Sequence, residues 1–253
     1  MSAIKLHARA SADFERKLQQ SRAQLTAFAD RYPRGFGASE PAVVQASSLG
    51  AEDMVISHLI DALALDFGIF VLQTGMLHGQ TLTLLARLQQ TSRAPVTTYQ
   101  PRAQAVVQFV ARNGKDAMFR SVDLRKACCG IRKMEPLVRA LDGKSGWITG
   151  LRRDQSGARA DVVLLDLSDP LRAKLNPLAD WSWGDVWHYI ALHAVDYNPL
   201  HDAFFPSIGC APCTRAISLG EDFRAGRWWW ENEKAKECGL HVAKQDQTEG
   251  MSA

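Results

Sequence analysis

The chain has 253 residues, of which 46% are hydrophobic and 23% are charged, a composition typical of a globular protein with one large domain or slightly more. This composition excludes a small disulfide-stapled scaffold, a collagen-like repeat and a coiled coil. The 30 Lys and Arg residues outnumber the 27 Asp and Glu residues by only three, so bulk charge does not indicate a nucleic-acid partner, and we expect any bound anion to be small.

Neither a membrane span nor a secretory signal is predicted. The sequence contains no run of 18 apolar residues, and the segment after Met1 has no apolar core followed by small residues. We therefore expect a cytoplasmic protein that does not contact a membrane.

The first 40 residues predict an N-terminal helical segment. Apolar residues at near-helical spacing between residues 12 and 31 indicate one helix that packs on the rest of the chain. From residue 41 onward, short apolar runs alternate with segments of helical spacing: strand 42–46, helix 52–65, strand 68–72, helix 82–88, strand 96–99, helix 103–112, helix 124–141, strands 147–149 and 162–167, and helix 183–194 after the N-cap Ser182. This alternation predicts an α/β fold with a mostly parallel sheet and helices on both faces. After Tyr197 the sequence becomes irregular, which indicates a C-terminal appendage.

The first predicted strand ends in SSLGAED, residues 47–53, directly before a helix. A Ser/Gly turn at this position offers backbone N–H groups and a helix dipole to an anion such as a nucleotide phosphate. An ordinary strand-to-helix turn is the alternative. A Rossmann fingerprint is absent, and Gly143-Lys144-Ser145 does not complete a Walker A motif because Val138 stands at the position of its first glycine.

Four of the five cysteines form two pairs, Cys128 with Cys129 and Cys210 with Cys213. In a reducing compartment, four thiolates suit a four-iron four-sulfur cluster or a structural zinc ion. Adjacent side chains diverge on a regular helix, so two neighbouring ligands require a local distortion, which Gly130 would permit.

A zinc site is a second interpretation of the later cysteines. Spacing alone also allows a Cys3His site made of Cys210, Cys213, Cys238 and His241, although this leaves the adjacent cysteine pair unexplained. Cys238 is otherwise either a nucleophilic thiolate or a leftover thiol.

Basic residues cluster near both cysteine pairs. They would stabilise a negatively charged cluster or hold an anionic substrate, and a solvated helix face is the alternative. The first set surrounds the adjacent pair, and the second comes after the C-x-x-C motif: Arg120, Arg125, Lys126, Arg132 and Lys133, then Arg215, Arg224 and Arg227. The three tryptophans at 228–230 are expected to anchor the appendage on the core.

Taken in order, these motifs resemble the assimilatory adenylyl-sulfate (APS) reductases, the iron–sulfur branch of the APS/PAPS reductase family. The resemblance runs from about Ser47 to His241 and rests on SSLGAED, LQTGMLH (72–78), CCGIRKMEPL (128–137), WITGLRRDQS (147–156), NPLADWSWGDVWHYI (176–190), YNPLHDAFFPSIGCAPCTR (197–215), and GEDFRAGRWWWE with KECGLH. Because PAPS reductases of the family lack the paired cysteines, the resemblance implies the branch that uses APS.

The resemblance implies a fold like that of the ATP pyrophosphatases, with a nucleotide-binding α/β domain over 41–200 and a cluster-binding segment with a catalytic tail over 201–253. It implies one 4Fe-4S cluster on Cys128, Cys129, Cys210 and Cys213. The SSLGAED turn would cradle the nucleotide as a modified phosphate loop. Substrate-binding positions are implied at Ser47, Ser48, Gly50, Asp53, Leu72, Thr74, Gly75, Gly150 and Arg153.

The resemblance also implies a mechanism for the reduction of APS, a step of sulfate assimilation and cysteine biosynthesis. The Cys238 thiolate would attack the sulfur of APS and release AMP, and thioredoxin or a similar dithiol would free sulfite from the resulting thiosulfonate. The cluster would be structural and electrostatic, with Lys133 between it and the substrate. Arg224, Arg227 and His241 match positions that contact the sulfate and neutralise charge. The sequence leaves the oligomeric state open and allows a homo-oligomer.

The chain departs from the family pattern at Gln73 and Met76, which replace an acid and a base near the presumed adenosine pocket. Two other classes remain open. One is an ATP-dependent cluster-bearing tRNA thiolase, against which the S-x-G-A-E-D turn argues; the other is a non-catalytic zinc-stabilised binding module.

Overall fold

The computed structural model describes residues 2–218 and 220–231. A six-stranded sheet with the order β3-β2-β1-β4-β6-β5 forms its centre. All neighbouring strands pair in parallel except β5, which is antiparallel to β6. The strands are β1 (Val43–Ser47), β2 (Gly68–Leu72), β3 (Val96–Tyr99), β4 (Gly146–Ile148), β5 (Leu165–Asp166) and β6 (Ala173–Leu175). The predicted α/β class with a mostly parallel sheet is confirmed.

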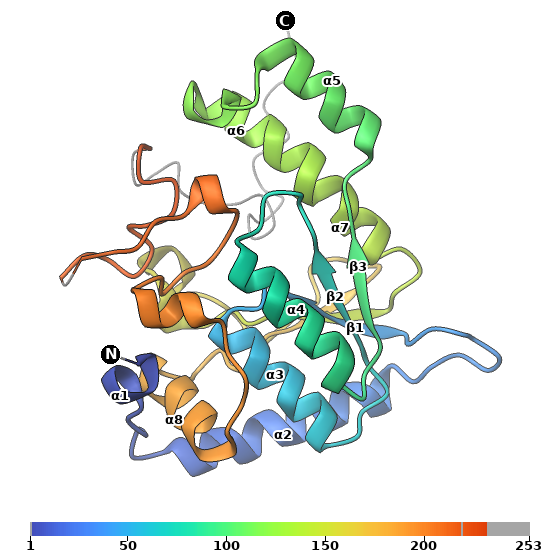
Figure 1. The fold of residues 1–253 in the computed structure, drawn as a ribbon. Coiled ribbons are helices and arrows are strands. Elements are labelled where there is room, and N and C mark those ends of the chain that lie inside the picture. The colour runs from blue at the N-terminus through green and yellow to red at the C-terminus, as the bar shows by residue number, and fades with distance from the viewer. Residues whose placement is uncertain (1, 219, 232–253) are drawn as a thin grey trace, which may run out of the picture.

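Helices connect the strands and cover the sheet (Figure 1). The α-helices are α1 (Ala3–His7), α2 (Phe14–Arg31), α3 (Ala51–Ala62), α4 (Gly79–Thr91), α5 (Ala103–Asn113), α6 (Val122–Cys129), α7 (Glu135–Ala140) and α8 (Trp183–His193). In Figure 1, α2, α3 and α4 lie together on one side of the strands, whereas α5, α6 and α7 form a second group, of which α7 lies beside β2 and β3.

The strands bury side chains on both faces, as a parallel sheet requires. On β1, Val43 belongs to the large core with α2, α3, α4 and α8, whereas Val44 packs with Leu137 of α7 on the other face. On β2, Ile69 and Phe70 divide between the two faces in the same way. Both layers therefore hold the strand ends in fixed positions.

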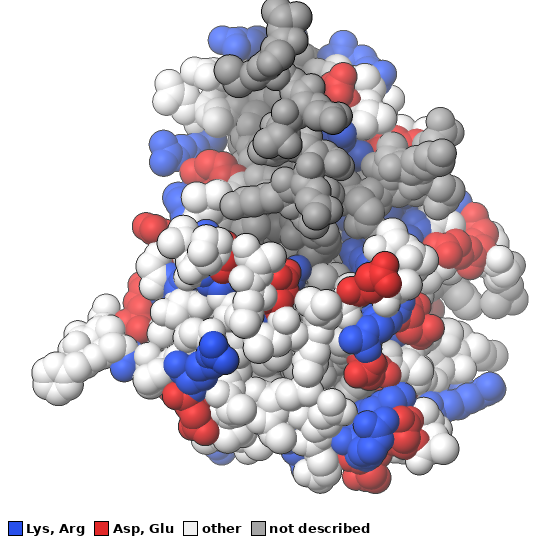
Figure 2. All heavy atoms as spheres, turned by 180° about the vertical axis from the view of Figure 1, so that it is seen from behind, with Lys and Arg blue, Asp and Glu red and all other residues white. Residues whose placement is uncertain are grey.

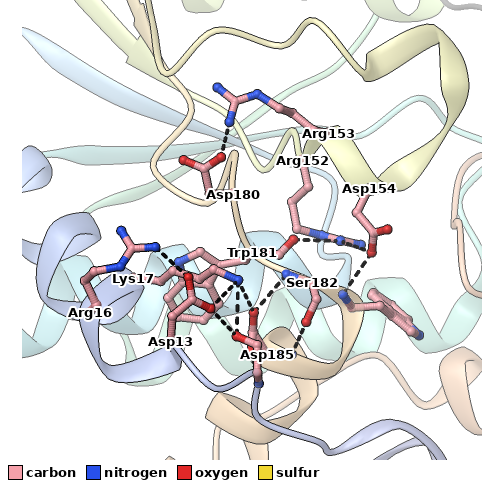
Figure 3. A network of polar contacts seen from close by, with 12 residues as sticks. Asp13, Arg16, Lys17, Arg152, Arg153, Asp154, Asp180, Trp181, Ser182 and Asp185 are labelled. Carbon is pink, nitrogen blue, oxygen red and sulfur yellow. Dashed lines mark hydrogen bonds and ion pairs between the residues drawn. The ribbon is translucent and has the colours of Figure 1, made fainter.

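The N-terminal helical segment packs on the main core through α1 and α2. Figure 3 shows the polar link between α2 and the start of α8, where the buried Asp185 accepts hydrogen bonds from the backbone N–H of Ser11 and from Ser182 N–H, at 2.7 and 2.9 Å. Lys17 of α2 lies 3.1 Å from the same carboxylate. Ser182 caps α8, as its position in the sequence predicts.

The predicted helix over 124–141 is interrupted. The α6 helix ends at Cys129, a π-helical turn spans Gly130–Met134, and α7 comes next. The backbone is thus distorted directly after the adjacent cysteines, and π-helical turns of this kind occur frequently at functional sites.

Two short elements, α1 and β6, have no counterpart among the predicted elements. Three residues in β6 are too few to show a period. The strand predicted over 162–167 is only two residues long.

On the face drawn in Figure 2, acidic and basic side chains are interspersed rather than gathered into a patch of one sign. None of the helices in the described ranges combines the length and the apolar character that crossing a membrane requires.

Candidate active site

A cleft opens at the carboxyl ends of β1, β2 and β4, where ligands bind in open parallel sheets. Its empty volume, which includes space open to solvent, is ≈ 1290 Å³. Ten of the catalytic and substrate-binding residues that the resemblance implies line it: Ser47, Ser48, Gly50, Asp53, Leu72, Thr74, Lys133, Gly150, Arg224 and Arg227.

The loop after β1 is organised around the Asp53 carboxylate. Its Oδ2 accepts hydrogen bonds from the backbone N–H and the hydroxyl of Ser48, both at 2.7 Å. Burial raises the pKa of Asp53 to about 6, an effect that these hydrogen bonds oppose and the neighbouring Glu52 increases. The first turn of α3 therefore contains a carboxyl group with a pKa near neutrality.

A buried His201 supports the same loop from the C-terminal part of the chain. Its Nε2 accepts a hydrogen bond from the backbone N–H of Ala51, the first residue of α3, at 3.2 Å. Burial lowers the pKa of His201 to about 4, so the ring is neutral at pH 7 and its Nε2 can act as an acceptor.

The Glu52 carboxylate pairs with a buried guanidinium that the sequence analysis did not single out. Arg152 lies 2.9 Å from Glu52, and Gln155 donates a hydrogen bond to the same carboxylate oxygen at 2.9 Å. Burial alone would raise the pKa of Glu52, but Arg152 and Gln155 outweigh it and the pKa is lowered. This acid is therefore ionised and held on one wall of the cleft.

Arg153 and Gly75 do not line the cleft, although the resemblance implied both as substrate-binding positions. In Figure 3 the Arg153 side chain points toward Asp180, with which it forms an ion pair, and it also donates to the carbonyl of Val162 at 2.8 Å. Arg159 lines the cleft instead. The neighbouring residues Arg152 and Arg153 therefore pair with different acids, Glu52 and Asp180. The sequence pattern could not show this difference.

Three cations that line the cleft, Lys133, Arg224 and Arg227, are called the basic wall below. Both arginines are buried, and Arg227 donates to the carbonyl of Ile208 at 3.2 Å. A Cβ at Gly209 would lie 2.6 Å from Arg227, so this position must be glycine for the guanidinium to sit where it does.

The four paired cysteines line a second cavity with an empty volume of ≈ 280 Å³. Cys128, Cys210 and Cys213 are buried, and Cys129 is half-buried. The hydroxyl of Thr74 lies 3.3 Å from the sulfur of Cys210. Burial raises the pKa of the Cys128 thiol, and it raises that of Cys213 to about 12.

The donor set and its surroundings are those of a metal centre with thiolate ligands. A single bound zinc ion would have its thiolate ligands at about 2.3 Å. Among the described residues, no three Cys, His, Asp or Glu side chains are grouped so as to hold one metal ion. The cavity is lined by Arg125, Arg132 and Lys133 and, within the described chain, by no carboxylate. Four thiols from two segments thus surround a space with cationic walls.

Lys133 and Cys210 line both cavities. Lys133 lies in the π-helical turn. The turn after the adjacent cysteines therefore brings a cation to the boundary between the cleft and the cysteine-lined cavity.

Trp228 lies between two arginines that belong to different cavities. Arg125, which lines the cysteine-lined cavity, is 4.5 Å from the tryptophan ring centroid, and Arg227, which lines the cleft, is 4.8 Å from it. Arg125 also forms a buried ion pair with Glu231 at 2.8 Å. Trp228 is buried and packs against both guanidinium groups, so it anchors the appendage as expected. Trp229, for which the same role was expected, is 40% exposed.

Cys238 and His241 lie outside the described residues, so their roles stay predictions. Four residues with structural roles at these sites were not predicted from the sequence. Their contacts connect residues about one hundred or more positions apart: Arg152, Gln155, His201 and Glu231. The sequence could have indicated them only if each side chain had been matched in advance with its distant partner.

The comparisons with known proteins agree with one another. Residues 42–216 match the model of the phosphoadenosine phosphosulfate reductase domain. The chain is 51% identical over 201 residues to an adenosine 5'-phosphosulfate reductase of Allochromatium vinosum, covering 79% of this chain and 78% of that protein. It is 50% identical over 199 residues to the Burkholderia cepacia protein of the same name, covering 78% of this chain and 79% of the relative.

Solved structures share the fold at low identity. A phosphoadenylyl-sulfate reductase from Candida auris, in a phosphate complex, superposes with a TM-score of 0.63 at 20% identity and covers 83% of this chain and 98% of its own. An FMN adenylyltransferase from Candida glabrata gives a TM-score of 0.55 at 11% identity and covers 96% of this chain and 85% of its own.

Proposed function

The chain belongs to the phosphoadenosine phosphosulfate reductase family, and on that premise we propose that it reduces APS to sulfite and AMP in sulfate assimilation. The observation that carries the proposal is the shared boundary of the two cavities, which Lys133 and Cys210 both line. The names of the relatives and the two cysteine pairs favour APS over PAPS as substrate.

The basic wall is the part of the cleft suited to a phosphosulfate. Guanidinium groups hold sulfate and phosphate oxygens through paired N–H donors, and buried charges are pre-oriented before the substrate arrives. Arg224 and Arg227 are buried, and Lys133 is held by the π-helical turn. These three residues would bind the two acidic groups of APS and stabilise the charge that develops on AMP as it leaves.

The substrate-binding positions that line the cleft would enclose the nucleotide. Leu72, Thr74 and Gly150 lie at the ends of β2 and β4, and apolar residues such as Phe70 and Leu137 line the same cleft. An adenine ring would find its apolar surface here.

We further propose that Cys128, Cys129, Cys210 and Cys213 hold one 4Fe-4S cluster. Their convergence on one cavity and the cations around it support this assignment. When bound, the cluster would link the two cysteine segments and supply a charged centre next to Lys133.

Cys238 is proposed as the nucleophile and His241 as a group that neutralises charge. The Cys238 thiolate would form an S–S bond to the sulfonyl sulfur as the S–O bond to AMP breaks. The first thiolate of thioredoxin or a similar dithiol protein would then attack the Cys238 sulfur and displace sulfite. The second thiol would resolve the mixed disulfide, so the dithiol ends oxidised and sulfite carries the two electrons. This chemistry favours a reducing compartment, and we propose the cytoplasm.

The reaction is tested by measuring sulfite release from APS and from PAPS with thioredoxin, using anaerobically purified protein. We expect faster release from APS. Release from neither substrate, or turnover of ATP, would reject the proposal in favour of a binding module or an ATP-dependent enzyme.

Metal analysis tests the cluster separately. Iron without zinc is expected, and Cys128→Ser should lose the iron and destabilise the surrounding structure. Cys238→Ser is the matched control, because it removes a cysteine outside the four and should keep the iron. One zinc and no iron per chain would overturn the assignment.

A further inference from the structure

The loop between β1 and α3 has the geometry of an anion-binding site. It comes after a parallel strand, and Gly50 stands at the N-cap of the 12-residue α3 without a side-chain capping bond. Helix N-termini at such loops take phosphates through their free N–H groups and the helix dipole. Whether this loop can do so depends on which of its N–H groups are still available.

In this chain three N–H groups of the loop already have acceptors within the protein. Ser48 donates to the Asp53 carboxylate. Leu49 donates to the hydroxyl oxygen of Ser47 at 3.2 Å, and Ala51 donates to His201. A phosphate on this loop would have to displace these acceptors.

The Asp53 carboxylate is closely packed as well as hydrogen-bonded. Only 7% of the residue is exposed. A Cβ on Gly150, two residues after β4, would lie 2.6 Å from Asp53 Oδ1, so the backbone at Gly150 packs closely against the carboxylate. The side chain thus fills the space above the loop.

Acidic and basic side chains both line the cleft. Asp53 and Glu52 belong to the first turn of α3, where Glu52 is already paired with Arg152, and the basic wall adds three cations. With a pKa of about 6, Asp53 is largely ionised at pH 7 and above, and a phosphate oxygen at the loop would meet a carboxylate. An anionic substrate group is therefore directed to the basic wall.

We propose that Asp53 is a specificity-determining residue whose carboxylate occupies the anion position of the loop and excludes the pyrophosphate tail of ATP and free pyrophosphate. A nucleoside monophosphate joined to sulfate needs no second phosphate site, and its acidic groups can all reach the basic wall. The inference rests on the proposed function and adds to it the structural reason for rejecting a nucleoside triphosphate.

The test is calorimetric titration of the full-length, metal-loaded protein with AMP, ATP and pyrophosphate. Asp53→Ala removes both the charge and the acceptor. Asp53→Asn is the matched control, because its amide oxygen can still accept the Ser48 N–H while the charge is gone. The measured quantity is the ratio of ATP affinity to AMP affinity, which cancels any general effect of the substitution on the cleft.

We expect wild-type protein to bind AMP and to show no competition from millimolar pyrophosphate. In Asp53→Ala the ATP-to-AMP affinity ratio should rise by about tenfold or more, because donors are freed and a like charge is removed, and in Asp53→Asn it should rise by less. Tight pyrophosphate binding by the wild type, or an unchanged ratio in Asp53→Ala, would overturn the inference. Wild-type protein that neither binds AMP nor reduces APS would instead reject the proposed function.

Discussion

The buried ion pair between Arg125 and Glu231 allows a sharp test of how the appendage is attached. The two side chains are 2% and 3% exposed, and the guanidinium donates to both carboxylate oxygens, at 2.9 and 2.8 Å. Glu231→Gln would remove the carboxylate charge from this buried ion pair, which costs about 3–5 kcal/mol. For a domain of this size, that loss corresponds to a fall in Tm of roughly 6–20 °C.

The assay is thermal unfolding of metal-loaded protein at one scan rate, because metal loss on unfolding departs from two-state behaviour. Asp196→Asn is the control, since it breaks the Arg87–Asp196 pair, whose side chains are 45% and 49% exposed, and should change Tm by less than about 3 °C. Because Arg125 lines the cysteine-lined cavity, Glu231→Gln should also reduce the iron content. Equal Tm values for the two variants would refute this account of the appendage.

Substitutions at three other positions have expected outcomes of their own. Arg227→Ala should lower kcat/KM for APS, by an amount that corresponds to a loss of about 2–4 kcal/mol in transition-state stabilisation. Arg153→Ala removes a side chain outside the cleft and should change kcat/KM less than about threefold. Equal losses in the two variants would reject the role of the basic wall. Ala194→Gly should raise the free energy of unfolding by about 1 kcal/mol, because Ala194 directly after α8 has a φ of 50°, a left-handed conformation that favours glycine. Ala191→Gly inside that helix should lower the free energy of unfolding by a similar amount. Chemical denaturation measures both changes. The pKa of Asp53 is raised on folding from 3.8 to about 6, so ionisation of Asp53 lowers the free energy of unfolding as the pH rises from 4 to 6, by up to roughly 3 kcal/mol. The free energy of unfolding of the wild type relative to Asp53→Asn should therefore fall over that range. A difference that does not change with pH would contradict the assignment.

The order of the elements could be predicted because each is marked by a local pattern. The apolar runs that became β1 and β2 are buried on both faces, so they appear in the sequence as continuous hydrophobic segments. The interruption after Cys129 was anticipated only as a requirement for two adjacent ligands. Its form, a π-helical turn that carries Lys133, depends on backbone geometry that side-chain periodicity does not encode.

The candidate site was predictable as a set of residues but not as a set of contacts. The loop motif showed where an anion could sit, yet whether its N–H groups are free depends on the Asp53 side chain and on His201, 150 residues from Ala51. Similarly, the sequence cannot tell that Arg152 pairs with Glu52 whereas Arg153 pairs with Asp180. Such choices are made by tertiary packing.

The proposed role of Cys238 is the central chemical claim, and mass spectrometry of the intermediate tests it directly. Protein mixed with APS in the absence of a reductant should gain the mass of one sulfonate on the peptide that contains Cys238, with release of AMP. Cys238→Ser should keep its iron, bind AMP and gain no adduct, because a serine hydroxyl is a far poorer nucleophile than a thiolate. An adduct on another cysteine, or sulfite turnover by Cys238→Ser, would contradict the account.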